Sequence, residues 1–273
     1  MSDNVVIYHG NCYDGVTAAW VCWKKFGDNT EYIPMNYSDS PSDVKGKNVY
    51  IVDFSFKRPI IEQMHQDANF LLILDHHKTA EKELEGLNYA IFDMERSGAG
   101  IAWDHFFGTH NRPNLIHYIE DRDLWRFAWP NSKEVNAWIQ SFDIDLQTWI
   151  KEVAPGLDYL GALENVINEG KSLLRQQTKL VKSICYNAKL KRISDEYIGP
   201  YVQTNILMSE VCDMLLQNYP EYPFAFYSFE RKDGKFQYGL RSRSDFDVSV
   251  IAKKFGGGGH KQAAGFELDH ELK

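Results

Sequence analysis

The chain lacks any long apolar run. No stretch approaches the roughly 20 consecutive apolar residues that a membrane-spanning helix needs, and the first residues, Met1-Ser2-Asp3-Asn4, are polar and acidic, unlike a signal peptide. Cysteine is also scarce: four residues with no C-x-x-C pair and no zinc-ribbon spacing, namely Cys12, Cys22, Cys185 and Cys212. We therefore expect a reduced, cytoplasmic protein with no structural disulfide and no membrane partner.

An excess of basic residues is absent as well. The chain has 30 Lys and Arg against 38 Asp and Glu, a formal net charge of −8. Proteins that hold long nucleic acid through its phosphates normally present a basic surface. This balance argues against binding of long duplex nucleic acid, whereas a local basic pocket for a small phosphorylated ligand remains compatible with it.

What is present is typical of a soluble α/β protein. The 273 residues are 44% hydrophobic and 25% charged, and they contain no internal repeat. In the first half, short apolar runs alternate with helical patterns, which predicts a mainly parallel sheet flanked by helices. The helices are expected from about Gly15 to Phe26 and over 59–65, 97–107 and 115–122.

A long helical pattern over 157–184, without internal proline, predicts a linker helix. Beyond it we expect a smaller α+β domain with strands near 188–193 and 265–267 and helices over 209–216 and 248–254. Gly199-Pro200 should break the chain, and Asp233-Gly234 should turn a hairpin between 224–229 and 236–241. The expected domains are 1–155, the linker helix 156–187, and 188–273.

Three apolar runs end in polar side chains. The run 70–74 ends in Asp75-His76-His77, the run 49–52 ends in Asp53, and the run 5–8 ends in His9 with Asp14 shortly after. Open α/β sheets place their sites at the carboxyl ends of strands. Each of these residues alone could equally be a helix cap or part of a turn. Their convergence at the ends of three strands, however, indicates a metal-centred enzyme.

These motifs resemble the DHH phosphoesterase family, named for the tripeptide matched by Asp75-His76-His77. His9 with Asp14-Gly15 resembles its first motif and Asp53 its second, while a fourth falls within Glu120-Asp121-Arg122-Asp123. The glycine-rich signature of the family's associated C-terminal domain is matched by Phe255-Gly256-Gly257-Gly258-Gly259-His260 and Ala263-Ala264-Gly265-Phe266. The resemblance therefore spans nearly the whole chain.

The resemblance implies two divalent cations, usually manganese. Asp53 would bridge them, His9 would hold one, and the other would be held by Asp14, His76 and a later acid, for which we favour Asp121 over Asp123. His77 would face the phosphate, with Asp75 orienting a neighbouring imidazole. Independently of the family, carboxylate and imidazole suit such cations, and a pair of them can clamp both oxygens of a displacement at phosphorus.

Cys12 departs from the family pattern, because many relatives carry Asp there. A thiolate would favour iron or zinc over manganese or magnesium. We expect Cys12 to ligate; the alternatives are that the first metal has fewer protein ligands, that Asn11 or water substitutes, or that Cys12 is a small buried apolar residue.

The C-terminal glycine run is expected to bind substrate. Gly257, Gly258 and Gly259 allow close backbone approach and could form an anion nest, although four glycines could equally make a flexible turn. Upstream on or near a strand, Arg241 and Arg243 could reach the same anion or simply line a solvated face. With the family resemblance, His260 and the two arginines become candidates for holding a terminal phosphate or a base.

Together these features predict a metal-dependent phosphodiesterase that hydrolyses very short RNA, notably linear dinucleotides, to mononucleotides. The alternatives are a phosphatase of bisphosphorylated adenosine, a cyclic-dinucleotide phosphodiesterase, a pyrophosphatase, and a nucleotide-binding regulatory module that has lost catalysis. The expected cofactors are two divalent cations, manganese or, given Cys12, iron. The expected assembly is a monomer or a homodimer.

Overall fold

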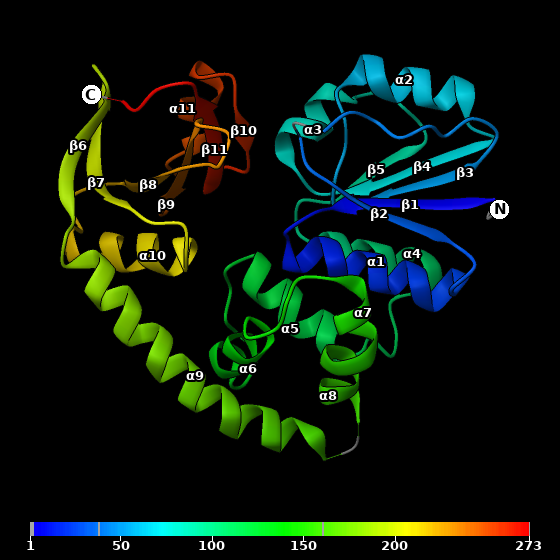
Figure 1. Ribbon diagram of the computed structural model, residues 1–273, viewed down its shortest axis with the longest axis horizontal. Coiled ribbons are helices and arrows are strands. Elements are labelled where there is room, and N and C mark those ends of the chain that lie inside the picture. The colour runs from blue at the N-terminus through cyan, green and yellow to red at the C-terminus, as the bar shows by residue number, and fades with distance from the viewer. Residues whose placement is uncertain (1–2, 38, 160, 273) are drawn as a thin grey trace. The chain divides into compact units, whose positions relative to one another are not determined.

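The computed structural model describes residues 3–37, 39–159 and 161–272 (Figure 1). The chain divides into two compact units, Met1–Leu174 and Arg175–Lys273. The long helix α9 (Ala162–Cys185) contains the point of division. The two units are described separately.

The first unit is built on a five-stranded sheet in the order β2-β1-β3-β4-β5. Its strands are β1 (Asn4–His9), β2 (Glu31–Met35), β3 (Asn48–Val52), β4 (Phe70–Asp75) and β5 (Ala90–Phe92), and every neighbouring pair is parallel. The predicted parallel α/β sheet is thus confirmed. The two strands that the sequence pattern missed are the edges: β2 contains Pro34, and β5 has three residues.

Both faces of this sheet are buried, as the uninterrupted apolar runs require. One face packs on α1 (Tyr13–Phe26) and α4 (Gly98–Phe107) through residues such as Val6 and Leu74. The opposite face, with Ile7 and Ile73, packs on α2 (Arg58–Asp67). Successive residues therefore point to opposite cores, and Figure 1 shows α2 and α1 on opposite sides of the strands.

The rest of the first unit is helical. It comprises α3 (Lys78–Glu83), α5 (Asn114–Asp123), α6 (Ser132–Ile139), α7 (Leu146–Thr148), a π-helical turn (Trp149–Val153), α8 (Ala154–Asp158) and the first part of α9. The predicted helices at 97–107 and 115–122 are confirmed as α4 and α5.

The second unit carries a six-stranded sheet in the order β10-β11-β9-β8-β7-β6. The strands are β6 (Lys189–Ser194), β7 (Tyr197–Gln203), β8 (Phe224–Glu230), β9 (Phe236–Ser242), β10 (Gly258–Gly259) and β11 (Ala263–Leu268); the helices are α10 (Met208–Asn218) and α11 (Val248–Lys254). Strands β7 and β8 are parallel and the other pairs antiparallel. The predicted α+β class and the β8–β9 hairpin are confirmed.

The predicted break at Gly199-Pro200 is wrong, because β7 runs through both residues. The β7–β8 ladder starts only at Tyr201, so Pro200 lies before the point where that ladder begins. Gly199 is needed for a different reason: a Cβ there would lie 2.9 Å from the Phe224 carbonyl oxygen. Gly199 therefore allows the close approach of β8.

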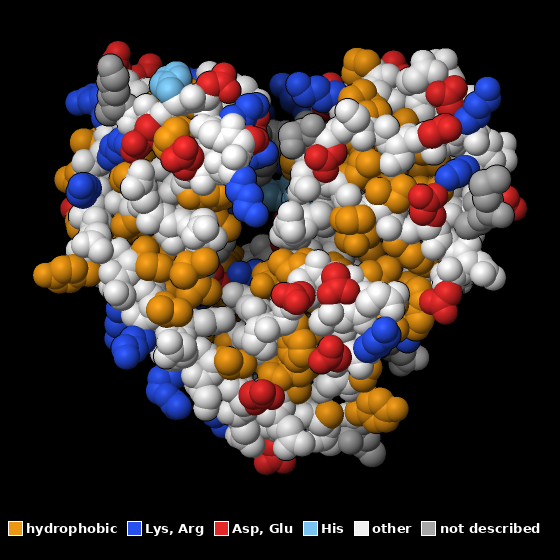
Figure 2. Space-filling view, in the orientation of Figure 1, with side chains coloured by type: hydrophobic (Ala, Val, Ile, Leu, Met, Phe, Trp, Pro, Cys, Tyr) orange, Lys and Arg blue, Asp and Glu red, His pale blue; other side chains and the backbone are white. Residues whose placement is uncertain are grey.

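The surface in Figure 2 carries basic side chains interspersed with acidic and apolar ones. Among the described residues, no helix is long and apolar enough to cross a membrane. The four cysteines are free thiols.

Candidate metal centre

The centre lies at the carboxyl edge of the parallel sheet. Strand β1 ends at His9, β3 is followed by Asp53, and β4 ends at Asp75. Because β1, β3 and β4 are adjacent and parallel, their carboxyl ends share one edge. The structure therefore brings the side chains that follow the three strands into one cluster.

Asp53 stands between two imidazoles. Its Oδ1 lies 3.1 Å from His76 Nε2, and its Oδ2 lies 3.5 Å from His9 Nδ1. The φ of Asp53 is 53°, in the left-handed region that a non-glycine residue rarely adopts. Such local strain is retained where the surrounding structure fixes a functional side chain.

His76 also faces two further carboxylates. Its Nε2 lies 3.6 Å from Asp123 Oδ2 and 3.7 Å from Asp14 Oδ2. Asp14 is buried and accepts hydrogen bonds from the N–H groups of Gly98 (2.6 Å) and Ala99 (3.1 Å). The positive end of α4 thus holds this carboxylate in place.

Within the first unit the ligand atoms form two adjacent groups, each with all atoms within 4.8 Å of one another: His9, Asp53 and His77 in the first, and Asp14, His76 and Asp123 in the second. The Asp53–His76 contact joins them. His9 Nδ1 and Asp53 Oδ2 are buried and have no hydrogen-bond partner. Two such atoms, side by side in a set of oxygen and imidazole donors, fit a divalent cation such as manganese.

The charges support the same interpretation. Burial raises the pKa of Asp14 well above its usual range, and the charges of Asp53 and Asp123 add to this. Burial would also raise the pKa of Asp53, but the imidazoles of His76 and His9 outweigh it and hold that pKa well below its usual value. Carboxylates crowded in this way are stabilised by positive charge, which a cation can supply.

Asp75 fixes the orientation of His77. The Oδ1 atom of this fully buried carboxylate accepts the N–H of His76 at 2.8 Å and lies 2.7 Å from His77 Nδ1. Burial would lower the pKa of His77, but the charge of Asp75 outweighs it and raises that pKa. The contact at Nδ1 directs Nε2 away from Asp75.

The structure places Asp123, rather than the Asp121 favoured from sequence, beside His76. The carboxylate of Asp121 accepts the N–H groups of Ala128 (2.8 Å) and Trp129 (3.2 Å). It therefore supports the segment after α5. The sequence Asp121-Arg122-Asp123 could not distinguish the two, because both lie in the last turn of one helix.

Cys12 precedes α1 and is partly buried. Burial, together with the charges of Asp53, Asp123 and Asp14, raises the pKa of its thiol well above the usual range. In the described chain Cys12 belongs to neither ligand group.

Three residues at the centre were not singled out from sequence. Gly98 lies against Asp53: a Cβ on it would stand 2.5 Å from Asp53 Cβ. Tyr37 packs its ring 5.5 Å from that of His9 and 6.1 Å from that of His77, and Arg96 pairs with Glu120 behind the start of α4. For Gly98, the available sequence signal was the run Ser97-Gly98-Ala99-Gly100, since small residues at the start of a helix permit close approach of another segment.

In the second unit the predicted substrate-binding residues have local partners. Arg241 donates to Ser209 Oγ at 3.0 Å, and Arg243 donates to the main-chain oxygen of Asp213 at 3.1 Å. His260 follows β10 and its N–H bonds the Ala263 carbonyl.

The glycines at positions 257–259 lie beside β11. A Cβ on Gly257 would lie 2.0 Å from the Gly265 oxygen, and one on Gly259 would lie 2.5 Å from the Ala263 oxygen. Gly258 pairs with Gly265 in the β10–β11 ladder, and the Gly257 N–H donates a hydrogen bond to the Ala252 carbonyl oxygen. Contact or pairing with β11 therefore explains Gly257, Gly258 and Gly259, whereas Gly256 has a φ of +80° and no atom of the described residues within 4 Å of an added Cβ.

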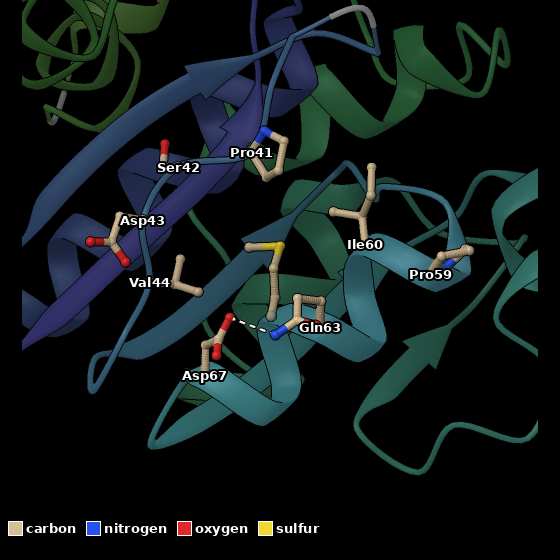
Figure 3. A pocket seen from close by; sticks show the side chains of 9 residues that line it. Pro41, Ser42, Asp43, Val44, Pro59, Ile60, Gln63 and Asp67 are labelled. Carbon is tan, nitrogen blue, oxygen red and sulfur yellow. Dashed lines mark hydrogen bonds between the residues drawn. The ribbon is translucent and has the colours of Figure 1, made fainter.

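A separate cavity of about 300 Å³ lies between α2 and the segment before β3 (Figure 3). Its lining, which includes Pro41, Val44, Ile60 and Met64, is mostly apolar and contains none of the ligand-group residues.

Comparison with known proteins identifies the C-terminal domain and the fold. Residues 197–273 match the DHHA1 domain. The uncharacterized protein R106 of Acanthamoeba polyphaga mimivirus is 32% identical over 96% of the chain, which spans 66% of that relative's length. Two solved structures share the fold with TM-scores of 0.53 and cover 97% of the chain: the pGpG-specific phosphodiesterase PggH of Vibrio cholerae (13% identity, 93% of its chain) and RecJ of Thermus thermophilus in complex with Mn²⁺ (15%, 49%). Residues 197–273 are therefore a DHHA1 domain, and the ordered N-terminal motifs and the fold make the chain similar to the DHH phosphoesterases.

Proposed function

We propose that the protein is a divalent-metal-dependent phosphodiesterase that hydrolyses very short oligoribonucleotides, notably linear dinucleotides, to mononucleotides. The observation that carries this proposal is the 3.1 Å contact between Asp53 and His76, which joins two three-residue ligand groups at one sheet edge. Paired cation sites that share a carboxylate are suited to displacement at phosphorus.

The chain's own residues have the following proposed roles. His9 and Asp53 hold one cation, Asp14, His76 and Asp123 hold the other, and Asp53 lies next to both. Two divalent cations bound there supply Lewis acidity at the phosphoryl group and activate water. Asp75 keeps His77 oriented toward His9 and Asp53, where the His77 imidazole contacts the substrate phosphate.

Manganese is the proposed metal. The two groups offer only carboxylate oxygens and imidazole nitrogens, a donor set that suits manganese. The Mn²⁺ complex of RecJ, which shares the fold, guides the choice of metal for assays. Cys12 remains a proposed modifier of metal preference, since its thiol is close enough for Asp53, Asp123 and Asp14 to raise its pKa.

The second unit is proposed to recognise the substrate. Arg241, Arg243 and His260 offer cationic or hydrogen-bonding groups for phosphate or base, and the glycines 257–259 keep that segment close to β11. A small substrate is consistent with the net charge of −8. The name of PggH, a pGpG-specific phosphodiesterase of shared fold, makes a linear dinucleotide the first substrate to test.

The test is a substrate panel with manganese, magnesium, iron and cobalt in turn. Linear dinucleotides, longer RNA, cyclic dinucleotides and bisphosphorylated adenosine are incubated with the protein, and the products are separated by chromatography. We expect linear dinucleotides to be cleaved fastest. A higher kcat/KM for bisphosphorylated adenosine or a cyclic dinucleotide than for linear dinucleotides would make that compound the substrate instead. Inactivity toward the whole panel would overturn the proposed function.

A further inference from the structure

An aromatic loop, residues 124–131, connects α5 to α6. It contains Trp125, Phe127 and Trp129, and the two tryptophans are 36% and 42% exposed. The rings of Trp125 and Phe127 lie 4.9 Å apart at 79°, an edge-to-face pair. Trp129 is used differently, because it stacks on His117 at 4.3 Å. Trp125 and Phe127 therefore form one aromatic surface, which we call the Trp125 platform.

The backbone of this loop is held by Asp121. The main-chain oxygen of Asp121 accepts the N–H groups of Arg126 (2.8 Å) and Phe127 (3.3 Å), and its carboxylate accepts those of Ala128 and Trp129. A loop whose amides are bonded in this way has a fixed backbone, which sets the positions from which the rings of Trp125 and Phe127 project. The platform is thus preorganised, which lowers the entropic cost of binding a planar ligand.

Both platform residues have unusual backbone conformations. The φ angles are 54° for Trp125 and 47° for Phe127, in the left-handed region where bulky side chains are disfavoured. Glycine would remove this strain but would also remove the rings. Strain of this kind is retained where the surroundings fix it and where the position of the side chain matters.

Positive charge adjoins the same rings. The Arg122 guanidinium lies 5.9 Å from the ring centroid of Trp125, and the Lys133 ammonium lies 5.3 Å from that of Phe127. In a chain with a net charge of −8, cations beside exposed rings complement an anionic, aromatic ligand. Aromatic rings with neighbouring cations are how proteins bind single-stranded nucleotides.

The platform also adjoins the metal centre along the chain. Trp125 follows Asp123 by two residues, and the Asp123 carboxylate lies 3.6 Å from His76. The Arg122 guanidinium contacts the ring of Tyr13, the neighbour of Asp14, at 5.5 Å. A nucleotide whose phosphate reached the centre would have its base within a short distance of the loop.

We infer that the Trp125 platform stacks a nucleobase of the short single-stranded substrate, with Arg122 beside an adjoining phosphate. This inference rests on the proposed function and deepens it, since it makes the substrate a nucleotide ester rather than any phosphodiester. Stacking tolerates every base, because each presents a π face. The platform therefore predicts preference for nucleotides with little preference among bases.

The test compares Trp125→Ala, Trp125→Phe and the control Trp129→Phe on two substrates. One is a linear diribonucleotide and the other is its abasic analogue, which keeps the sugars and the phosphodiester but has no base and no other aromatic ring. We expect Trp125→Ala to raise the KM for the dinucleotide about tenfold, while kcat/KM for the base-free ester stays within about twofold of the wild-type value. Trp125→Phe should restore most of the affinity, and Trp129→Phe should match the wild type.

A second readout does not depend on turnover. Titration with adenosine 5′-monophosphate should quench tryptophan fluorescence in the wild type and in Trp129→Phe, and much less in Trp125→Ala. The inference is overturned if Trp125→Ala keeps its KM for the dinucleotide, or if it loses the same factor on both substrates. If the wild type cleaves neither substrate, the proposed function fails, and the nucleotide titration alone decides whether the platform binds a base.

Discussion

The Nε2 atom of His76 lies 3.1 Å from Asp53 Oδ1, while the other oxygen of Asp53 faces His9 at 3.5 Å. One carboxylate therefore touches both ligand groups. Asp53 is the residue whose loss should affect two cations, whereas His9 and Asp14 each belong to one group.

We therefore expect Asp53→Asn to weaken both cation sites, and His9→Ala or Asp14→Asn to remove one. Titration calorimetry with Mn²⁺ measures the stoichiometry and the affinities. Removal of a metal ligand should weaken the affected site by at least about tenfold, the effect typical of residues that merely orient ligands. Two unaltered sites in Asp53→Asn would contradict the shared role of this carboxylate.

Asp121 and Asp123 provide a matched pair of variants two residues apart. Asp123→Asn should reduce Mn²⁺ content and leave the fold unchanged, because this carboxylate faces His76. Asp121→Asn should instead lower the free energy of unfolding by roughly 1–3 kcal/mol, because it weakens the charged hydrogen bonds to Ala128 and Trp129. Elemental analysis and urea unfolding measure the two effects, and a reversed pattern would make Asp121 the ligand.

Gly98 should tolerate no side chain. A Cβ there would stand 2.5 Å from Asp53 Cβ and 2.8 Å from Asp53 Cα, so Gly98→Ala must displace the backbone of Asp53. We expect a loss of Mn²⁺ affinity of about 10- to 100-fold.

The control for this variant is Gly86→Ala. Gly86 has a φ of +86°, and no atom lies within 4 Å of its added Cβ. Gly86→Ala should cost about 1 kcal/mol of stability through backbone strain and leave Mn²⁺ affinity unchanged. Equal metal affinity in both variants would show that the start of α4 does not constrain Asp53.

Asp104 makes stability depend on pH. Burial would raise the pKa of Asp104, but its bonds to Arg112 and Arg96 outweigh this and lower that pKa. A lowered pKa contributes stability above the unfolded-state value of about 3.9, and this stability is lost as the pH falls through the folded-state pKa.

Asp104→Asn should accordingly reduce the free energy of unfolding at pH 7 by roughly 1–3 kcal/mol. The difference in free energy of unfolding between Asp104→Asn and the wild type should shrink as the pH falls below about 4. Urea unfolding at pH values from about 3 to 7 measures this difference. A difference that stays constant over this range would exclude the charge of Asp104 as its source.

Sequence was sufficient where one physical rule dominated. The apolar runs 5–8, 49–52 and 70–74 predicted buried parallel strands, and adjacency of their carboxyl ends brought His9, Asp53 and His76 together. The Asp233-Gly234 signal gave the β8–β9 hairpin. These features depend on local pattern and on sheet topology.

Sequence was insufficient where tertiary contacts decide. Both Asp121 and Asp123 end α5, and only packing shows that one holds a loop while the other faces His76. Gly199-Pro200 reads as a break, yet both residues pair with β6 in the sheet, and Phe224 leaves no room for a side chain at Gly199. The small-residue run around Gly98 does not reveal the role of this glycine, since that role comes from contact with Asp53, which follows a strand much earlier in the chain.

The most direct test of the central proposal measures release of mononucleotides from a linear diribonucleotide by the wild type and by Asp53→Asn, with Mn²⁺ and with a chelator. We expect mononucleotides from the wild type with Mn²⁺, and only background release with the chelator or with Asp53→Asn. Undiminished release by Asp53→Asn, or release by the wild type that the chelator leaves unchanged, would contradict it.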